Sequence, residues 1–235
     1  MPLFKTALRA RGGFETEMSQ HTSATTIDAP GAVSLYDRFA QLYDITFKFN
    51  GYARSLERYL RERDLPLGEG AEILDAGCGT GLVTLAILRT LRRPSHITAI
   101  DLSAPSLAKA RYWVAKESES ARHRVRFAQA NLLALPFADE SFDFVATSGA
   151  LEYVPLGAGL AELARVLKPG GHLLHIPVRP APLGKVLEVI FRFKTHPPAE
   201  VEQHTRRHFQ ILERYSFPPL EPIGWTKLAI LAQKP

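Results

Sequence analysis

The chain has 235 residues, of which 46% are hydrophobic and 23% charged, and its formal net charge is +5 at pH 7. The composition is ordinary for a globular protein, and the length suits one α/β domain with a short leader. No stretch approaches the roughly 20 apolar residues that cross a bilayer, and basic residues are scattered among acidic ones. A membrane span is therefore not expected. The charge alone does not select a partner, and because the chain shows no appended nucleic-acid-binding module, nucleic acid is not expected as a partner either.

The first 31 residues are expected to form a flexible leader. Residues 1–14 are basic and contain no acid, as in a transit peptide, but they lack a secretory apolar core and a clear cleavage site. Residues 18–31 are rich in Ser, Thr, Ala and Gly, which leaves little to bury. We expect one folded domain over residues 32–235, in which residues 178–215 form an insert or lid.

Hydrophobic residues at helical spacing between residues 33 and 63 predict two helices with a break around Asn50 and Gly51. Short apolar runs then alternate with helical patterns. The predicted strands are 71–77, 96–103, 125–131, 141–149 and 172–178, and the predicted helices are 80–91, 105–117 and 160–167. This alternation is typical of a Rossmann-like, doubly wound, mostly parallel sheet.

The regular alternation ends after residue 178. Prolines bracket the apolar segment 183–193, which predicts an inserted helix or lid, and another helix is expected over residues 199–215. The C-terminal residues, with prolines at 218, 219 and 222 before the apolar run 226–234, predict a weak sixth strand and a stronger seventh one.

A glycine-rich turn, DAGCGTG, follows the first predicted strand. Its glycines allow a sharp turn and expose backbone N–H groups near a helix N-terminus, where a polar ligand can approach closely. Asp75 would place a carboxylate beside this loop, where it can meet an ammonium group directly or through water. Asp101 ends the next strand, where an acid can accept hydrogen bonds from both hydroxyls of a ribose.

The spacing of the glycines separates two kinds of nucleotide site. A NAD site has the fingerprint GxGxxG, whereas this chain has GxGxG with an acid two residues before the first glycine. The spacing argues against a dinucleotide. A merely structural turn with two surface carboxylates is the alternative, and the flanking strands argue against it.

The motifs resemble those of the class I S-adenosylmethionine-dependent methyltransferases, in particular the group that methylates small molecules, lipids and quinones. The resemblance covers residues 36 to the C-terminus. It rests on YDRFAQLYD, LDAGCGTG, IDLS, ANLLALPFADESFDFV and ELARVLKPGG, which occur in this order. It implies a seven-stranded sheet whose last strand is antiparallel.

The resemblance also implies a set of cofactor-binding residues. They are Gly77, Cys78 and Gly79 at the methionine end, with Asp75 nearby, Asp101 and Leu102 at the ribose and adenine, Asn131 and Leu132 at the adenine edge, Ser148 beside the sulfonium, and Tyr36 over the cofactor. The family usually has Asp where this chain has Asn131, so the hydrogen bond to the adenine amino group would use the amide oxygen of Asn131.

Methyl transfer from a sulfonium is an in-line displacement, so the protein mainly aligns the acceptor and excludes water. An acceptor that is an oxygen or carbon acid would also need a base, for which Glu152, Tyr153 and His175 are candidates near the strand ends. Tyr43 would lie near the transferred methyl group. Tyr36 and Tyr43 also suit the buried face of an amphipathic helix, and His175 suits a core position.

The sequence thus predicts methyl transfer from S-adenosylmethionine to a small-molecule or lipid-like acceptor, without a metal. A catalytically silent protein that binds this cofactor is the alternative. The single cysteine, Cys78, indicates a reducing compartment such as the cytoplasm. Cations beside the apolar segment 183–193 indicate possible peripheral membrane contact, with an ordinary solvated face as the alternative. The oligomeric state does not follow from the sequence.

Overall fold

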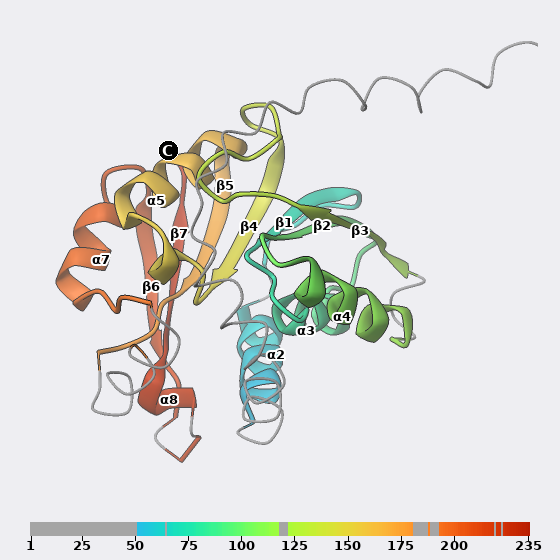
Figure 1. Cartoon of the computed structure of the whole chain (residues 1–235), viewed down its shortest axis with the longest axis horizontal. Coiled ribbons are helices and arrows are strands. Elements are labelled where there is room, and N and C mark those ends of the chain that lie inside the picture. Colours follow the sequence, from blue (N-terminus) through green and yellow to red (C-terminus); the bar gives the residue numbers. More distant parts are fainter. Residues whose placement is uncertain are drawn as a thin grey trace, which may run out of the picture. The chain divides into compact units, whose positions relative to one another are not determined.

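The computed structural model describes residues 51–63, 65–117, 122–180, 188, 193–218, 220–221 and 223–235. Its centre is a seven-stranded sheet with the order β3-β2-β1-β4-β5-β7-β6 (Figure 1). The strands are β1 (Ala71–Ala76), β2 (Ser95–Asp101), β3 (Arg124–Gln129), β4 (Phe142–Ser148), β5 (Leu167–Ile176), β6 (Gln210–Ser216) and β7 (Leu228–Gln233).

Among the described strands, β7 alone runs antiparallel to the others. The strands β1 to β5 pair in parallel where they are neighbours, and β7 is antiparallel to both β5 and β6. Chain order runs outward from β1 to β2 and β3 on one side and from β4 to β5 on the other. Ligands of open α/β sheets bind at such a switch point, beyond the carboxyl ends of the strands. The fold therefore directs attention to the loops after β1, β2 and β4.

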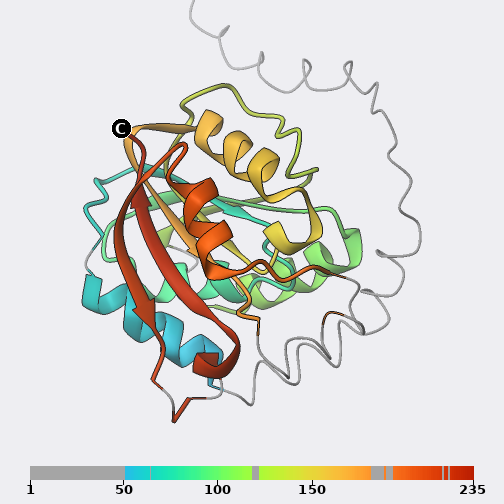
Figure 2. The ribbon, with the colours of Figure 1, turned by 90° about the vertical axis from the view of Figure 1, so that its left-hand side faces the viewer.

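Helices cover both faces of the sheet, as Figures 1 and 2 show. The helices α2 (Tyr52–Arg63), α3 (Leu82–Thr90) and α4 (Ala104–Ala115) lie on one face, and α5 (Leu156–Val166) and α7 (Pro198–Thr205) lie on the other. Two helices are short: η2 (Leu151–Tyr153) directly follows β4, and α8 (Ile223–Thr226) directly precedes β7. None of the described helices combines the length and apolar character that a membrane crossing requires.

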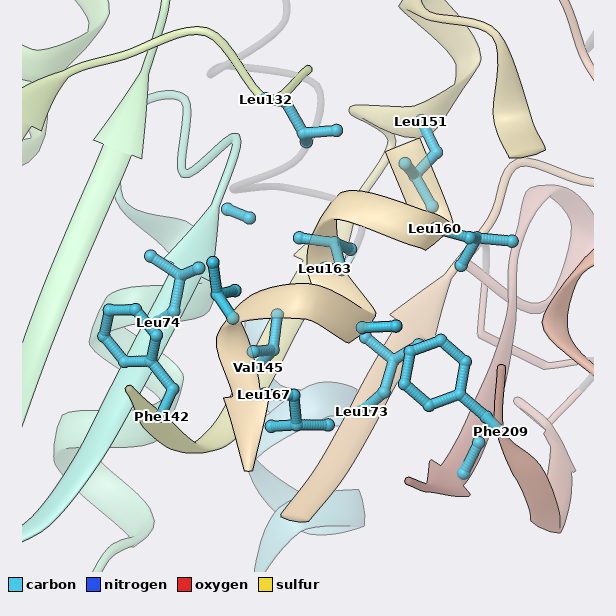
Figure 3. Packing of buried hydrophobic residues seen from close by; sticks show 14 of the residues in the cluster. Leu74, Leu132, Phe142, Val145, Leu151, Leu160, Leu163, Leu167, Leu173 and Phe209 are labelled. Atoms are coloured by element: carbon cyan, nitrogen blue, oxygen red, sulfur yellow. The ribbon is translucent and has the colours of Figure 1, made fainter. Parts of the chain in front are cut away.

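Each face of the sheet has its own hydrophobic core. Under α5 and α7, leucine side chains from α5 and from the strands pack around Val145 and Phe209 (Figure 3). Under α2 and α3, Leu56, Tyr59 and Phe144 are at most 1% exposed. Burial of each such side chain contributes about 1.5–3 kcal/mol, so the two cores hold the strand ends in place.

Ion pairs attach α2 to β6, the edge strand opposite β3, and to the segment that follows β6. Arg63 donates to both carboxylate oxygens of Glu213 on β6, at 2.5 and 2.7 Å. Arg58 pairs with Glu221 at 2.5 Å, and the Tyr59 ring lies 4.8 Å from that of Tyr215. These contacts position the first residue of α2, Tyr52, near the carboxyl end of β4.

The structure confirms the predicted seven-stranded sheet with an antiparallel last strand, and it confirms the helix that begins after Gly51. The predicted helix over residues 199–215 is wrong in its second half, because α7 ends at Thr205 and β6 follows. Residues 210–216 are rich in good helix formers, but exposure alternates along them and they pair with β7. Tertiary pairing therefore overrides local helix propensity. The sixth strand lies before Pro218, and the leader and most of the segment 183–193 lie outside the described residues.

Candidate active site

The glycine loop connects β1 to α3. Gly77, Gly79 and Gly81 have φ angles of 75°, 53° and 91°. The expectation that the loop offers its N–H groups to a ligand is wrong for three of them. The N–H groups of Gly77 and Cys78 donate to the Ile100 carbonyl at 2.9 and 2.8 Å, and that of Gly79 donates to Asp101. The loop is therefore tied to the end of β2 and lacks the row of available donors that cradles a phosphate.

The Asp101 carboxylate organises the end of β2. Its Oδ2 accepts the Gly79 N–H at 2.8 Å and its Oδ1 accepts the Ser103 N–H at 2.9 Å. A carboxylate at this position is also of the kind that accepts hydrogen bonds from the hydroxyls of a ligand. Leu102, directly after it, exposes 53% of its surface, which suits an apolar ring stacked on it.

Asp75 lies fully buried at the end of β1. Thr84 Oγ1 donates to its Oδ2 at 2.5 Å, whereas its Oδ1 has no hydrogen-bond partner among the described residues. Burial raises the pKa of Asp75 to about 7, and the Asp101 carboxylate adds to this effect. A cationic group placed at Oδ1 would favour the ionised form, so the site has the character of an ammonium acceptor.

The loop after β3 completes the rim on the β2 side. The Asn131 amide oxygen accepts the Leu133 N–H at 2.9 Å, which fixes the orientation of the exposed amide. Leu132 is 8% exposed and packs into the core under α5. Cys78 is buried, and burial together with the nearby carboxylates raises the pKa of its thiol well above its usual value, so this cysteine stays protonated.

Three polar side chains meet at the end of β4. The Tyr52 and Ser148 hydroxyls lie 2.6 Å apart, and Lys227 Nζ donates to Ser148 Oγ at 3.0 Å. Lys227 is 3% exposed, and its ammonium lies 5.5 Å from the centre of the Tyr52 ring. Burial lowers the pKa of Lys227 to about 8, although the Glu152 carboxylate opposes this effect.

Glu152 is a buried carboxylate at the same edge, in η2. Its Oε1 accepts the Val178 N–H at 2.5 Å, while its Oε2 has no hydrogen-bond partner in the part of the chain that the structure describes. Burial raises the pKa of Glu152, and the charge of Lys227 partly opposes the rise. A buried carboxylate with a raised pKa and an available oxygen is suited to take up a proton.

The predicted tyrosines differ in how far the structure tests them. Tyr36 and Tyr43 lie outside the described residues. Tyr153 is described, and its ring lies 5.7 Å from that of Phe193. Desolvation raises the pKa of Tyr153, and the carboxylates of Glu152 and Asp101 raise it further. Its hydroxyl therefore keeps its proton at neutral pH and can donate a hydrogen bond more readily than it can act as a base.

His175 is a core residue, as its position in β5 predicts. It is 1% exposed, and neither ring nitrogen has a hydrogen-bond partner among the described residues. Burial, followed by the charges of Lys227 and His196, lowers its pKa to about 3. Such a ring is a very weak base, so the interpretation of His175 as the catalytic base loses its support.

His175 should make the fold sensitive to acid. The unfolded chain binds a proton at this residue below pH 6.5, whereas the folded chain does so only near pH 3, so its contribution to stability is lost as the pH falls through this window. Between pH 7 and 5 this amounts to up to about 2 kcal/mol. Urea unfolding at both pH values should show a smaller loss for His175→Leu than for wild type. His208→Leu should keep the wild-type loss, and an equal loss in both variants would contradict the prediction.

Sequence reasoning missed Tyr52 and Lys227. Tyr52 directly follows Gly51 at the start of α2, outside the tyrosine motif that the resemblance identified. Lys227 precedes the apolar strand β7. Because lysines are rarely buried, a lysine next to such an apolar run could have indicated a buried charge with a role in the site. Among the described residues, no group of three or more His, Cys, Asp or Glu side chains is arranged to hold a metal ion.

Residues 73–171 match the family model of a methyltransferase domain. The chain is 32% identical over 193 residues to the demethylmenaquinone methyltransferase of Lactiplantibacillus plantarum, with 74% of this chain and 79% of that protein covered. It is 34% identical over 153 residues to the demethylmenaquinone methyltransferase of Thermus thermophilus, with 64% and 67% covered. A geranyl diphosphate C-methyltransferase from Streptomyces coelicolor, solved with S-adenosyl-L-homocysteine, aligns with a TM-score of 0.62 over 76% of this chain and 75% of that one. Their sequence identity is 17%, so this likeness shows the fold alone.

Proposed function

The chain belongs to the class I S-adenosylmethionine-dependent methyltransferases, and we propose that its acceptor is a lipid-like ring compound with an ionisable hydroxyl, such as a prenylated hydroquinone. The chain transfers a methyl group from S-adenosylmethionine to a small-molecule acceptor. The finer proposal draws support from the names of the two bacterial relatives and from a single observation. The Glu152 carboxylate is buried, and its Oε2 has no hydrogen-bond partner among the described residues.

The residues at the switch point fit the methyl donor. The Asp75 Oδ1 has no hydrogen-bond partner among the described residues and suits the amino group, and the Asp101 carboxylate at the end of β2 is of the kind that accepts hydrogen bonds from ribose hydroxyls. The exposed Leu102 suits one face of the adenine ring, with Leu132 and the fixed Asn131 amide at its edge. Bound there, S-adenosylmethionine supplies an activated methyl group, which in this arrangement would face Ser148.

Glu152 is proposed as the base for the acceptor hydroxyl. A hydroxyl on an aromatic ring is a weak nucleophile until it loses its proton, so transfer to this oxygen or to the neighbouring ring carbon requires a proton acceptor. Glu152 Oε2 has no partner among the described residues, and the Val178 N–H holds the other oxygen in place. An amine acceptor would need no such group.

Residues 193 and 194, inside the predicted insert, contact η2. The Lys194 N–H donates to the Glu152 carbonyl at 3.0 Å, and Phe193 packs against Tyr153. We propose that residues 178–215 include a cap over the acceptor.

Leu220 and Trp225 are 94% and 58% exposed on the connection between β6 and β7, at the same edge of the sheet. They suit contact with the membrane surface from which a lipid-like acceptor would come.

A panel of acceptors tests the function. Methyl-labelled donor is supplied with a reduced, prenylated naphthohydroquinone in anionic phospholipid vesicles, with its water-soluble unprenylated analogue, and with a primary amine. We expect transfer to both hydroquinones, faster transfer to the prenylated one, and co-sedimentation of the protein with vesicles. Transfer only to the amine would overturn the proposal. Donor binding without transfer to any acceptor would instead support the silent binding protein.

Glu152→Gln should lower kcat for the hydroquinones by about 10²- to 10⁴-fold, because it removes the proton acceptor but keeps the bond to Val178. In wild type, kcat/KM should rise as the pH passes upward through the raised pKa of Glu152, and the variant should lack this limb. The matched control is Glu72→Gln, at the start of β1, which should keep both rate and profile. Donor affinity should be the same in all three proteins.

A further inference from the structure

His196 lies next to the buried Glu152, although the two are far apart in the sequence. The chain just before His196 is tied to η2, because the Lys194 N–H donates to the Glu152 carbonyl at 3.0 Å. The elements η2 and α7, which begins two residues after His196, both pack against α5. Burial raises the pKa of Glu152, and the charges of Lys227 and His196 are among the effects that oppose the rise. His196 is therefore within electrostatic reach of the Glu152 carboxylate.

The two nitrogens of the His196 ring have different surroundings. Nδ1 lies 3.0 Å from Glu200 Oε1, whereas Nε2 is buried and has no hydrogen-bond partner among the described residues. An ionised carboxylate only accepts hydrogen bonds, so Nδ1 carries the hydrogen and Nε2 carries the lone pair. His196 is 8% exposed, and the Glu200 side chain is 36% exposed. The ring thus holds a proton acceptor inside the protein and is oriented by a carboxylate at its surface.

Glu152 Oε2 and His196 Nε2 share the same deficiency. Both atoms are buried, and neither has a hydrogen-bond partner within the part of the chain that the structure describes. When Glu152 is ionised, two acceptors cannot bond to each other, whereas one water molecule can donate a hydrogen to each. Buried polar groups nearly always have a partner, and ordered water is a common one. The pair therefore suits a bridging water.

A cavity adjoins this pair. Its volume is about 200 Å³, and its lining includes His196 and Val178, whose N–H holds the other carboxylate oxygen of Glu152. The lining also includes the charged residues Glu202 and Arg214, whose side chains are 31% and 46% exposed. Such a volume has room for several water molecules. His196 therefore lies between the buried carboxylate and a space that leads to the surface.

We propose that His196 returns Glu152 to its ionised form after each methyl transfer, by taking up the proton through a bridging water and passing it to water in this cavity. The inference rests on the proposed function, because it presumes that Glu152 receives the hydroxyl proton of the acceptor. A return path is needed because Glu152 is 4% exposed and its Oε2 is buried. The Glu200 carboxylate stabilises the imidazolium that forms on the way, since an opposite charge at hydrogen-bond distance favours the charged form.

The steps balance in protons and electrons. In methyl transfer the hydroxyl proton passes to Glu152 Oε2, the electron pair of the oxyanion forms the bond to methyl, and the electrons of the broken bond stay on sulfur. Oε2 then donates its proton to the bridging water, which donates one of its own to His196 Nε2. The imidazolium loses this proton to water in the cavity and keeps the proton on Nδ1, so the starting tautomer returns. Transfer to a ring carbon ends with that carbon's proton on the oxygen, so one proton again leaves for each methyl group.

His175 does not offer the same path. Burial, followed by the charges of Lys227 and His196, lowers its pKa to about 3, so it does not hold a proton near neutral pH. It is also 1% exposed and lies within β5. The titratable groups around Glu152 and His196 are thus His175 from β5, Lys227 before β7 and Glu200 from α7, and of the two histidines only His196 combines an inward acceptor with a link to the surface.

The test follows the methyl group and the proton separately in the first turnover. Enzyme loaded with S-adenosylmethionine is mixed, without oxygen, with the water-soluble naphthohydroquinone in weakly buffered solution that contains a pH indicator. Wild type should release one proton per methyl group, at the rate of transfer. His196→Gln can bond to water but cannot take up a proton. It should transfer the first methyl group at the wild-type rate, release the proton about tenfold or more slowly, and show a steady-state kcat limited by that release. The control His208→Gln, in the loop after α7, should match wild type in all three rates.

Each outcome separates this inference from the proposed function. If wild type methylates no hydroxyl-bearing acceptor, the proposed function fails. If wild type methylates them and His196→Gln releases the proton as fast as it transfers the methyl group, the role of His196 alone is overturned. Equal slowing of transfer and release in His196→Gln would also overturn it, since a purely structural role gives that result. If His196→Gln does not fold, Glu200→Gln decides, because it keeps an acceptor for Nδ1 but removes the charge that stabilises the imidazolium. Proton release that keeps pace with transfer in Glu200→Gln contradicts the proposal.

Discussion

Replacing Asp101 with alanine should weaken the binding of both S-adenosylmethionine and S-adenosylhomocysteine by a hundredfold or more. Two hydrogen bonds from ribose hydroxyls to a carboxylate contribute about 1.5–3 kcal/mol each, and a tenfold change in affinity corresponds to about 1.4 kcal/mol. The variant also removes the acceptor of the Gly79 and Ser103 N–H groups, which loosens the glycine loop. Titration calorimetry with both ligands measures the effect.

A control and an analogue separate the two roles of Asp101. Asp143 also accepts a backbone N–H, from Glu72 at 2.9 Å, but at the opposite end of the strands, so Asp143→Ala should keep donor affinity. A 2′,3′-dideoxy analogue of S-adenosylhomocysteine cannot donate to Asp101. Wild type should bind this analogue about as weakly as Asp101→Ala binds S-adenosylhomocysteine. If Asp101→Ala lowers the affinity for the natural ligand and for the analogue by the same factor, Asp101 acts only through the loop.

The relative positions of the residues proposed to bind the donor were predictable because their determinants are local in sequence. Asp75 lies near the end of β1, the three glycines follow it in the loop, and Asp101 ends the next strand, so the order of strand, turn and helix already places them together. What the pattern did not reveal was the direction of the hydrogen bonds. The loop N–H groups donate to Ile100 and Asp101 because β2 ends beside them, which requires the register of β1 on β2.

The polar cluster at the end of β4 depends on contacts between distant parts of the chain. Ser148 lies 96 residues from Tyr52 and 79 from Lys227 in the sequence, and the three meet because β7 inserts between β5 and β6. Hydrophobic periodicity does not encode that insertion. The same topology explains the error at residues 210–216, where pairing with β7 and the ion pair from Arg63 to Glu213 select an edge strand over a helix.

Gly77→Ala should have the largest effect on the fold of the site. Gly77 has a φ of 75°, and a Cβ placed on it would lie 2.2 Å from the Ala150 Cβ, far inside van der Waals contact. The left-handed backbone costs about 1–2 kcal/mol for a residue with a side chain, and forced overpacking adds about 1–3 kcal/mol. We expect a loss of roughly 3 kcal/mol in the free energy of unfolding, measured in urea, and loss of donor binding.

Gly70 supplies a matched control for this prediction. It has nearly the same φ, 73°, but a Cβ added there meets nothing within 4 Å, so Gly70→Ala should show the backbone cost alone and keep donor affinity. The double variant Gly77→Ala/Ala150→Gly removes the overlapping methyl group and should recover donor binding, while the backbone cost remains. Equal destabilisation by Gly70→Ala and Gly77→Ala, or a double variant no better than Gly77→Ala, would show that the contact between the loops after β1 and β4 does not determine the shape of the site.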